Sequence, residues 1–169
     1  DRKMYHYITD RLYDLGYNHY EISNAAIKGR ECRHNLKYWN MSDYVGIGAA
    51  AHSFINGCRF NNPSVLYEYI NMIETADSKD GKIIYDSLHE MKRQDTDELI
   101  GDCIFTGLRT ASGIDVAEFL KKYGIDLMQY KGKEINSYIE EGFMQQKDNH
   151  IFFTRKGIDI SNSIIAELI

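Results

Sequence analysis

The residues best suited to chemistry in this 169-residue chain lie in one stretch, residues 32–53, which holds two histidines, the only tryptophan and a Gly-x-Gly pair. Its first half, residues 33–39, reads RHNLKYW and places imidazole, amide, phenol and indole groups within seven positions. Imidazole is a common metal ligand, and aromatic rings pack well on planar ligands. We therefore expect any ligand contact of this protein to lie here.

The candidate contacts in this half are His34, Asn35, Tyr38 and Trp39, with His34 as the candidate metal ligand. A structural interpretation stands beside this one. A histidine near aromatic residues is often a hydrogen-bonded group in a half-buried loop, and a tryptophan is often a packing anchor. Because no second metal-type side chain stands at ligand spacing, the residues alone leave both interpretations open.

The second half alternates like a short buried strand over residues 44–48 and continues with small side chains. Gly46 and Gly48 would allow a ligand or another backbone to approach closely. His52 follows this expected strand, where ligands bind in α/β sheets, but it could equally tie down a loop by one hydrogen bond. We favour the structural role for His52.

Composition is that of a globular protein, with 43% hydrophobic and 27% charged residues. No apolar run approaches the roughly 18 residues of a membrane span, and the charged start lacks a signal-like segment, so we expect a cytoplasmic protein. Cys32, Cys58 and Cys103 are odd in number and widely spaced. This pattern argues against a disulfide framework and against a Cys-x-x-Cys metal site, and favours reduced thiols.

Hydrophobic periodicity predicts an α/β first part. Apolar residues from Met4 to Leu15 repeat at helical spacing, which predicts a helix ended by Gly16. Strands are expected over residues 20–24 and 44–48, side by side in a mainly parallel sheet, with a further helix after Pro63. The polar stretch 76–82 suggests a boundary, so we expect domains at residues 1–84 and 85–169.

The second part reads as three helices, a hairpin and a last helix, the order of a winged helix. Helices are expected over 91–108, from 114 and over 133–141, strands over 143–146 and 150–154, and a final helix over 157–168. Winged helices often bind DNA. However, residues 85–169 carry ten Lys and Arg against fifteen Asp and Glu, whereas phosphate contacts need a basic face. We therefore do not expect nucleic acid as a partner.

These motifs resemble those of the oxygen-independent coproporphyrinogen III oxidase-like radical SAM family, most closely its heme-chaperone branch. The matching segments span nearly the whole chain: Tyr-Glu-Ile-Ser-Asn at 20–24, His-Asn-x-x-Tyr-Trp at 34–39, Gly-x-Gly and Ala-His-Ser at 46–53, Gly-Leu-Arg at 107–109 and Phe-Thr-Arg-Lys-Gly at 153–157. Two departures concern Ala25 and Ile27, where the family often has an aromatic residue and proline, and Ala49 and Ala50, where it often has Pro-Gly.

The resemblance implies α/β plus α+β architecture: the last strands of a partial radical SAM (β/α) barrel, followed by a winged-helix-like domain. It also implies SAM and an iron–sulfur cluster, whose Cys-x-x-x-Cys-x-x-Cys loop would lie before residue 1, so that this C-terminal fragment alone would be inactive. By resemblance, heme would contact His34, Asn35, Tyr38 and Trp39, with the iron on His34, and Cys32 is a weaker candidate. Ala26, Gly46 and Gly48 would lie on the SAM side.

The implied function is either porphyrinogen oxidation or heme binding and delivery to a recipient protein, and the motif at 34–39 favours the chaperone. A different-class alternative is a winged-helix regulator with a ligand-sensing domain. With the earlier barrel strands outside the chain, a strand at 20–24 or 44–48 would keep an unpaired edge. We therefore expect the first half to self-associate.

Overall fold

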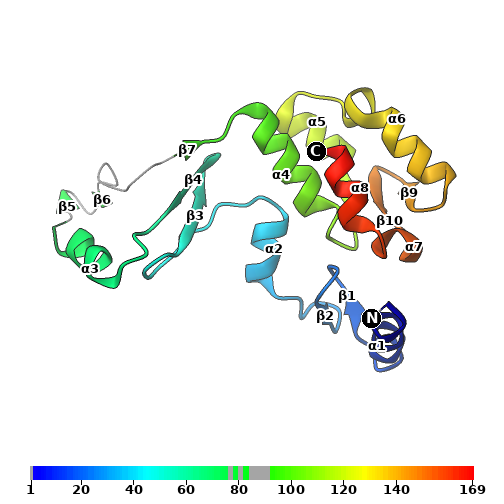
Figure 1. Ribbon diagram of the computed structural model, residues 1–169, viewed down its shortest axis with the longest axis horizontal. Coiled ribbons are helices and arrows are strands. Elements are labelled where there is room, and N and C mark those ends of the chain that lie inside the picture. Colours follow the sequence, from blue (N-terminus) through cyan, green and yellow to red (C-terminus); the bar gives the residue numbers. More distant parts are fainter. Residues whose placement is uncertain (1, 76–77, 80–81, 84–91) are drawn as a thin grey trace. The chain divides into compact units, whose positions relative to one another are not determined.

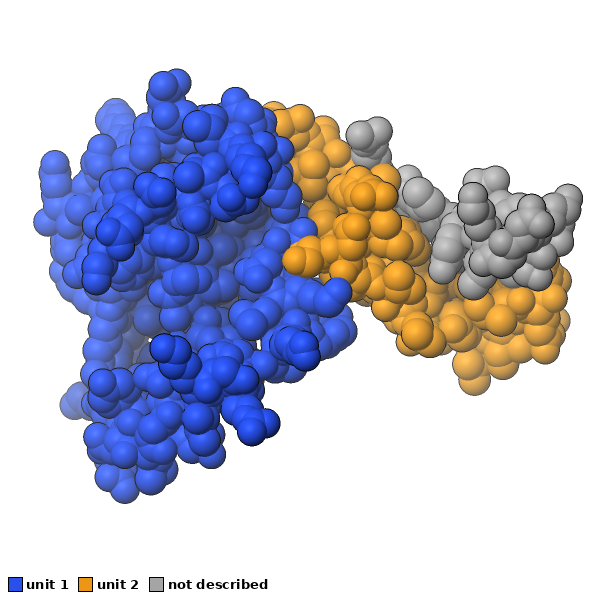
Figure 2. Space-filling view, turned by 180° about the vertical axis from the view of Figure 1, so that it is seen from behind, with its two compact units in different colours: residues 1–41, 100–169 blue, residues 42–99 orange. Residues whose placement is uncertain are grey.

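The computed structural model describes residues 2–75, 78–79, 82–83 and 92–169, with the side chains described outside residues 76–93 (Figure 1). The chain is mixed α/β and divides into two compact units (Figure 2). Unit 1 comprises residues 1–41 and 100–169, and unit 2 comprises residues 42–99. The boundary expected between residues 84 and 85 lies outside the described residues. In the part of the chain that the structure describes, no helix has the length and apolarity needed to cross a membrane.

Unit 1 begins with helix α1 (Arg2–Asp14), as the periodicity predicts, and Gly16 ends it with a φ of 83°. Strands β1 (Asn18–His19) and β2 (Ala25–Ala26) then pair antiparallel. The strand expected over residues 20–24 is wrong, since these residues form the connection between β1 and β2. Glu21 Oε1 accepts hydrogen bonds from Ser23 N and Asn24 Nδ2, and such local bonds compete with an extended conformation.

The C-terminal part of unit 1 combines helices with a small sheet. The helices are α4 (Thr96–Gly107, in unit 1 from Ile100), α5 (Val116–Tyr123), α6 (Leu127–Glu140), α7 (Arg155–Ile158) and α8 (Ser161–Leu168). The strands β8 (Ile114–Asp115), β9 (Met144–Lys147) and β10 (His150–Phe153) form an antiparallel sheet in the order β8-β10-β9. The predicted hairpin is therefore confirmed.

Helix ends in this part follow from capping side chains. Asp126 accepts from Met128 N and Gln129 N, so α6 begins at Leu127, earlier than the residue 133 expected from periodicity. The Thr154 hydroxyl caps α7 by accepting from Gly157 N. The single last helix expected over 157–168 is wrong. Two helices, α7 and α8, take its place, and Asp159 and Ile160 separate them.

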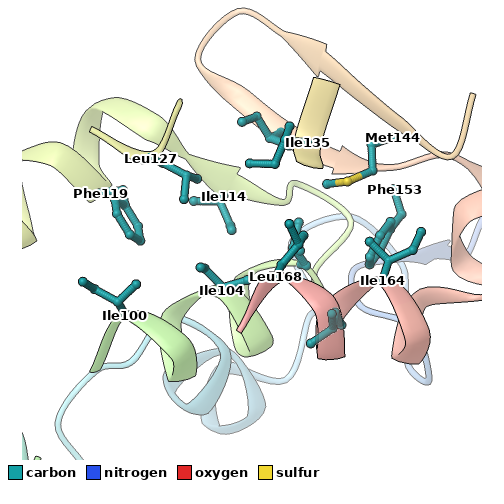
Figure 3. Close-up of a cluster of buried hydrophobic side chains, with 13 residues drawn as sticks. Ile100, Ile104, Ile114, Phe119, Leu127, Ile135, Met144, Phe153, Ile164 and Leu168 are labelled. Carbon is teal, nitrogen blue, oxygen red and sulfur yellow. The ribbon is translucent and has the colours of Figure 1, made fainter. Parts of the chain in front are cut away.

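The core of unit 1 is one cluster of thirteen buried hydrophobic residues (Figure 3). Ile100, Ile104 and Leu108 face it from α4 and the residue that follows, and Ile164 and Leu168 from α8. Burying such a side chain contributes about 1.5–3 kcal/mol relative to leaving it exposed. This core therefore fixes the helices of the C-terminal part on the small sheet.

Unit 2 is built on a hairpin of β3 (His52–Ile55) and β4 (Cys58–Asn61), with β7 (Lys92–Arg93) beside β4. Helix α3 (Leu66–Thr75) follows as predicted, and the short strands β5 (Ser78–Lys79) and β6 (Lys82–Ile83) pair antiparallel. The strand expected over residues 44–48 is wrong, and with it the parallel pairing. Only Tyr44 forms an isolated bridge, to Phe54, and the φ of 109° at Gly48 is incompatible with an extended strand.

Candidate functional site

Residues 33–39 form a short helix, α2 (Arg33–Trp39), in unit 1 (Figure 1). Cys32 precedes it in an extended conformation without a side-chain capping bond. Asn40 N donates to Leu36 O, and Met41 then takes a positive φ of 50° that ends the helix. Helical geometry brings residues four apart onto one face. The motif is thereby sorted into two i,i+4 pairs, His34 with Tyr38 and Asn35 with Trp39.

His34 and Tyr38 form a hydrogen-bonded pair on an exposed face of α2. The Tyr38 hydroxyl oxygen lies 3.0 Å from His34 Nε2. The two ring centroids are 4.9 Å apart at an interplanar angle of 86°, an edge-to-face contact. Both residues are exposed, so the pair presents one imidazole and one phenol to a ligand.

Trp39 belongs to the other side of the helix and is half-buried, as is Asn35. The Arg109 guanidinium carbon lies 5.4 Å from the centre of the Trp39 ring and 5.6 Å from that of Phe105, so Arg109 bridges two aromatic rings. Trp39 therefore anchors α2 to the end of α4. The anchoring role of Arg109 carries no local sequence signal, because 70 positions separate it from Trp39.

Comparison with known proteins supplies the family. The family described as the HemN C-terminal domain matches residues 94–160. The heme chaperone HemW of Lactococcus lactis is 32% identical over 166 residues, covering 98% of this chain and 41% of the relative. The corresponding protein of Bacillus subtilis is 30% identical over 166 residues, covering 98% of this chain and 42% of the relative. The chain belongs to the HemN and HemW family.

A solved structure of the HemN and HemW family agrees in fold. The coproporphyrinogen III oxidase HemN of Escherichia coli, described as a radical SAM enzyme, superposes with a TM-score of 0.66 at 16% identity, over 96% of this chain and 39% of that one. At this identity the likeness concerns the fold alone. The chain thus spans about two fifths of the length of the relatives it matches. The family resemblance inferred from the motifs is confirmed.

In this family member, the exposed pair on α2 fits a heme contact by its chemistry. Heme iron accepts imidazole nitrogen and phenolate oxygen as axial ligands, and His34 and Tyr38 offer one of each. Because Nε2 already faces the Tyr38 hydroxyl, coordination through that nitrogen requires this hydrogen bond to open. Among the described residues, no group of three or more His, Cys, Asp or Glu side chains is placed to hold a metal ion.

The glycines on the expected SAM side already serve the packing of unit 2. The carbonyl oxygens of Gly46 and Gly48 both accept from Asn62 Nδ2, at 3.1 Å and 2.8 Å. Their N–H groups donate to Ser53 Oγ and the Tyr69 hydroxyl. A Cβ at Gly46 would lie 2.3 Å from the His52 carbonyl oxygen, so this close backbone approach requires glycine.

Ala26, the third residue expected on the SAM side, lies in unit 1, where it is buried in β2 with 8% of its surface exposed. Its backbone pairs with Asn18 of β1. A role of Ala26, Gly46 and Gly48 toward SAM stays a prediction.

Proposed function

We propose that this chain carries a heme contact of a heme chaperone, with α2 as the contact helix. The observation that carries the proposal is the exposed His34–Tyr38 pair, which lies within a stretch similar to HemW over 98% of the chain. When bound, heme would supply an iron that accepts an imidazole nitrogen. His34 would hold that iron through Nδ1, because Nε2 faces the Tyr38 hydroxyl, and Tyr38 would orient the imidazole. Trp39, held by Arg109, keeps the helix in place.

The finer architecture follows the same proposal. Unit 1 from α4 onward has the element order helix, strand, helix, helix, strand, strand with the antiparallel sheet β8-β10-β9, which supports a winged-helix-like domain. We further propose that the complete protein binds SAM and an iron–sulfur cluster in a partial barrel, with Ala26, Gly46 and Gly48 on the SAM side. Heme passed on from α2 would go to a recipient protein.

A hemin titration of the complete gene product tests the heme contact, with the Soret absorption band as the readout. We expect His34→Ala to shift the band and to weaken hemin binding strongly, because it removes a bond to the metal. His52→Ala is the matched control, since His52 is also an exposed imidazole and its loss removes at most about one hydrogen bond, roughly 0.5–1.5 kcal/mol. Equal hemin affinity in the parent and in His34→Ala would indicate that α2 has a structural role and is not a heme contact.

Tyr38→Phe separates the ligand from its hydrogen-bond partner. If His34 is the axial ligand, Tyr38→Phe should leave the Soret position unchanged and weaken hemin binding by no more than about tenfold, the value of one hydrogen bond. A shifted band in Tyr38→Phe with an unshifted band in His34→Ala would instead make the phenol the iron ligand.

The regulator alternative is not favoured by the comparisons, and the charge of the C-terminal part also opposes it. Residues 85–169 carry ten Lys and Arg against fifteen Asp and Glu. Non-specific DNA binding depends on cations that neutralise phosphates. We expect labelled duplex DNA to bind weakly even at low salt, and tight, salt-sensitive binding in a fluorescence titration would contradict this.

A further inference from the structure

Unit 1 contains a cleft of about 360 Å³ that lies apart from the exposed His34–Tyr38 face. It opens among the end of α2, α4, the turn 110–115 and α5. Trp39, Phe119 and Tyr123 give it aromatic walls. Its volume falls at the lower end of the range for small-molecule sites, which suits a ligand of one or two rings.

Two hydrogen-bond donors at this cleft have no oxygen or nitrogen acceptor among the described residues. Trp39 Nε1 is buried without a hydrogen bond, the Tyr123 hydroxyl is buried with only a thiol as its partner, and both residues line the cleft. An indole N–H can only donate, so it requires an acceptor. The neighbour of the Tyr123 hydroxyl is the Cys103 thiol, a weak acceptor. A ligand that brings acceptor oxygens would satisfy both donors.

The Cys103 thiol and the Tyr123 phenol are neutral groups near pH 7. Burial raises the pKa of Cys103, and burial together with the neighbouring thiol raises the pKa of Tyr123. Neither group therefore adds a negative charge that would repel an anionic ligand.

The charged side chains of the cleft favour an anion at one end. Asp115 caps α5 through Oδ1, and its Oδ2 lies 3.7 Å from His150 Nε2. Glu118 is 3.3 Å from Lys121 Nζ. Lys122 Nζ, by contrast, has no carboxylate partner among the described residues: it donates to the Met41 carbonyl at 3.4 Å and lies over the Tyr123 ring. Glu118 is therefore paired with a cation and Asp115 is engaged as the cap of α5, whereas the Lys122 cation has no carboxylate partner among the described residues.

We propose that this cleft binds a small aromatic monocarboxylate. The ring of the ligand packs on the aromatic walls, and its carboxylate accepts hydrogen bonds from Trp39 Nε1, the Tyr123 hydroxyl and Lys122 Nζ. Trp39 follows His34 by five residues, about 140° around the helix, so this ligand and a heme on His34 use different faces of α2. The proposal is therefore independent of the heme contact.

Because Trp39 is the only tryptophan, a single indole N–H peak in a ¹⁵N NMR spectrum of this chain reports on the cleft. The probe is benzoate, and benzyl alcohol is the control ligand, which has the same ring but no charge. We expect benzoate to move the indole peak in a saturable way and benzyl alcohol to move it much less. Donors satisfied by water alone would leave the peak unmoved by benzoate, and this outcome would overturn the proposal.

Three variants locate the carboxylate. Lys122→Gln should weaken benzoate binding by up to about fivefold, the range of an exposed charge pair. Tyr123→Phe should weaken it by roughly two- to tenfold, the range of one hydrogen bond. Lys133→Gln is the control: its side chain is exposed and outside the cleft lining, and it should bind benzoate as the parent does. Equal effects of the two lysine variants, or none from Lys122→Gln, would contradict the proposed placement.

Discussion

Arg109 is the residue that links the contact helix to the core-bearing part of unit 1. Its guanidinium lies over Trp39 and Phe105, and its backbone carbonyl accepts from Ile22 N at 3.0 Å. One residue therefore ties α2, α4 and the β1–β2 connection together. A planar guanidinium can stack on two rings at once, which the compact ammonium of lysine cannot do.

We predict that Arg109→Lys lowers the unfolding free energy by about 0.5–2 kcal/mol, the range of partly desolvated cation–π contacts. Solvent should then reach the indole of Trp39, so its fluorescence maximum should move to longer wavelength. Arg11→Lys is the control, because Arg11 makes an exposed ion pair with Asp14 inside α1 at 3.5 Å. Unchanged emission and unchanged urea midpoint in Arg109→Lys would exclude the anchoring role.

At the scale of elements, α1 is fixed to α7 by polar contacts. Arg155 donates to both carboxylate oxygens of Asp10, at 2.6 Å and 2.9 Å, and to His6 Nδ1 at 2.9 Å. His6 Nε2 in turn lies 3.0 Å from an Asp159 carboxylate oxygen. The hydrogen bond from Arg155 holds the pKa of the Asp10 carboxyl below its usual value of 3.8.

This shift predicts that α1 loosens in acid. A lowered folded-state pKa gives a contribution that is complete above the unfolded value near 3.8 and is lost as the pH falls through the folded value. Amide exchange in α1 should therefore accelerate below about pH 4 relative to its rate at pH 6, after correction for intrinsic rates. Asp10→Asn should show fast exchange at both pH values. Asp14→Asn, which breaks a contact within α1 only, should behave like the parent.

Elements with a local signal were predictable from the sequence. The apolar repeat of α1, the turn at residues 147–149 and the stripe of α3 each specify an element through nearby residues. The β3–β4 hairpin was missed although Asn56-Gly57, with φ values of 49° and 75°, is a strong two-residue turn signal. The strand expected at residues 44–48 failed because hydrogen bonds from Asn62, fourteen to sixteen positions away, decide its backbone.

The candidate site could be predicted only in part, for the same physical reason. The residue types in the motif at 34–39 were sufficient to propose His34 and Tyr38 as a heme contact, which stays a prediction. The helix itself was not foreseen. The partners that place Trp39, and the cleft whose walls come from α2, α4 and α5, depend on contacts between residues far apart in the chain. Hydrophobic periodicity along the sequence does not reveal such contacts.

At the scale of the whole molecule, self-association of the first half stays a prediction, but its basis changes. Residues 20–24 and 44–48 form no strand whose edge could pair. Helix α3 of unit 2 instead exposes, besides Tyr67, the large aliphatic side chains of Leu66, Ile70 and Ile73, with 63%, 44% and 51% of their surface accessible. Their spacing of four and three residues places them on one helix face. Exposed apolar faces of this kind often mark interaction surfaces.

We predict that this chain forms dimers or larger species at tens of micromolar in sedimentation velocity. Ile70→Glu should shift it toward the monomer, because a charge buried in an apolar contact is costly. Asn71→Glu adds the same charge at the next position of α3, off the apolar face, and should associate like the parent. A monomeric parent, or an equal shift toward the monomer in Ile70→Glu and Asn71→Glu, would show that the apolar face of α3 does not drive association.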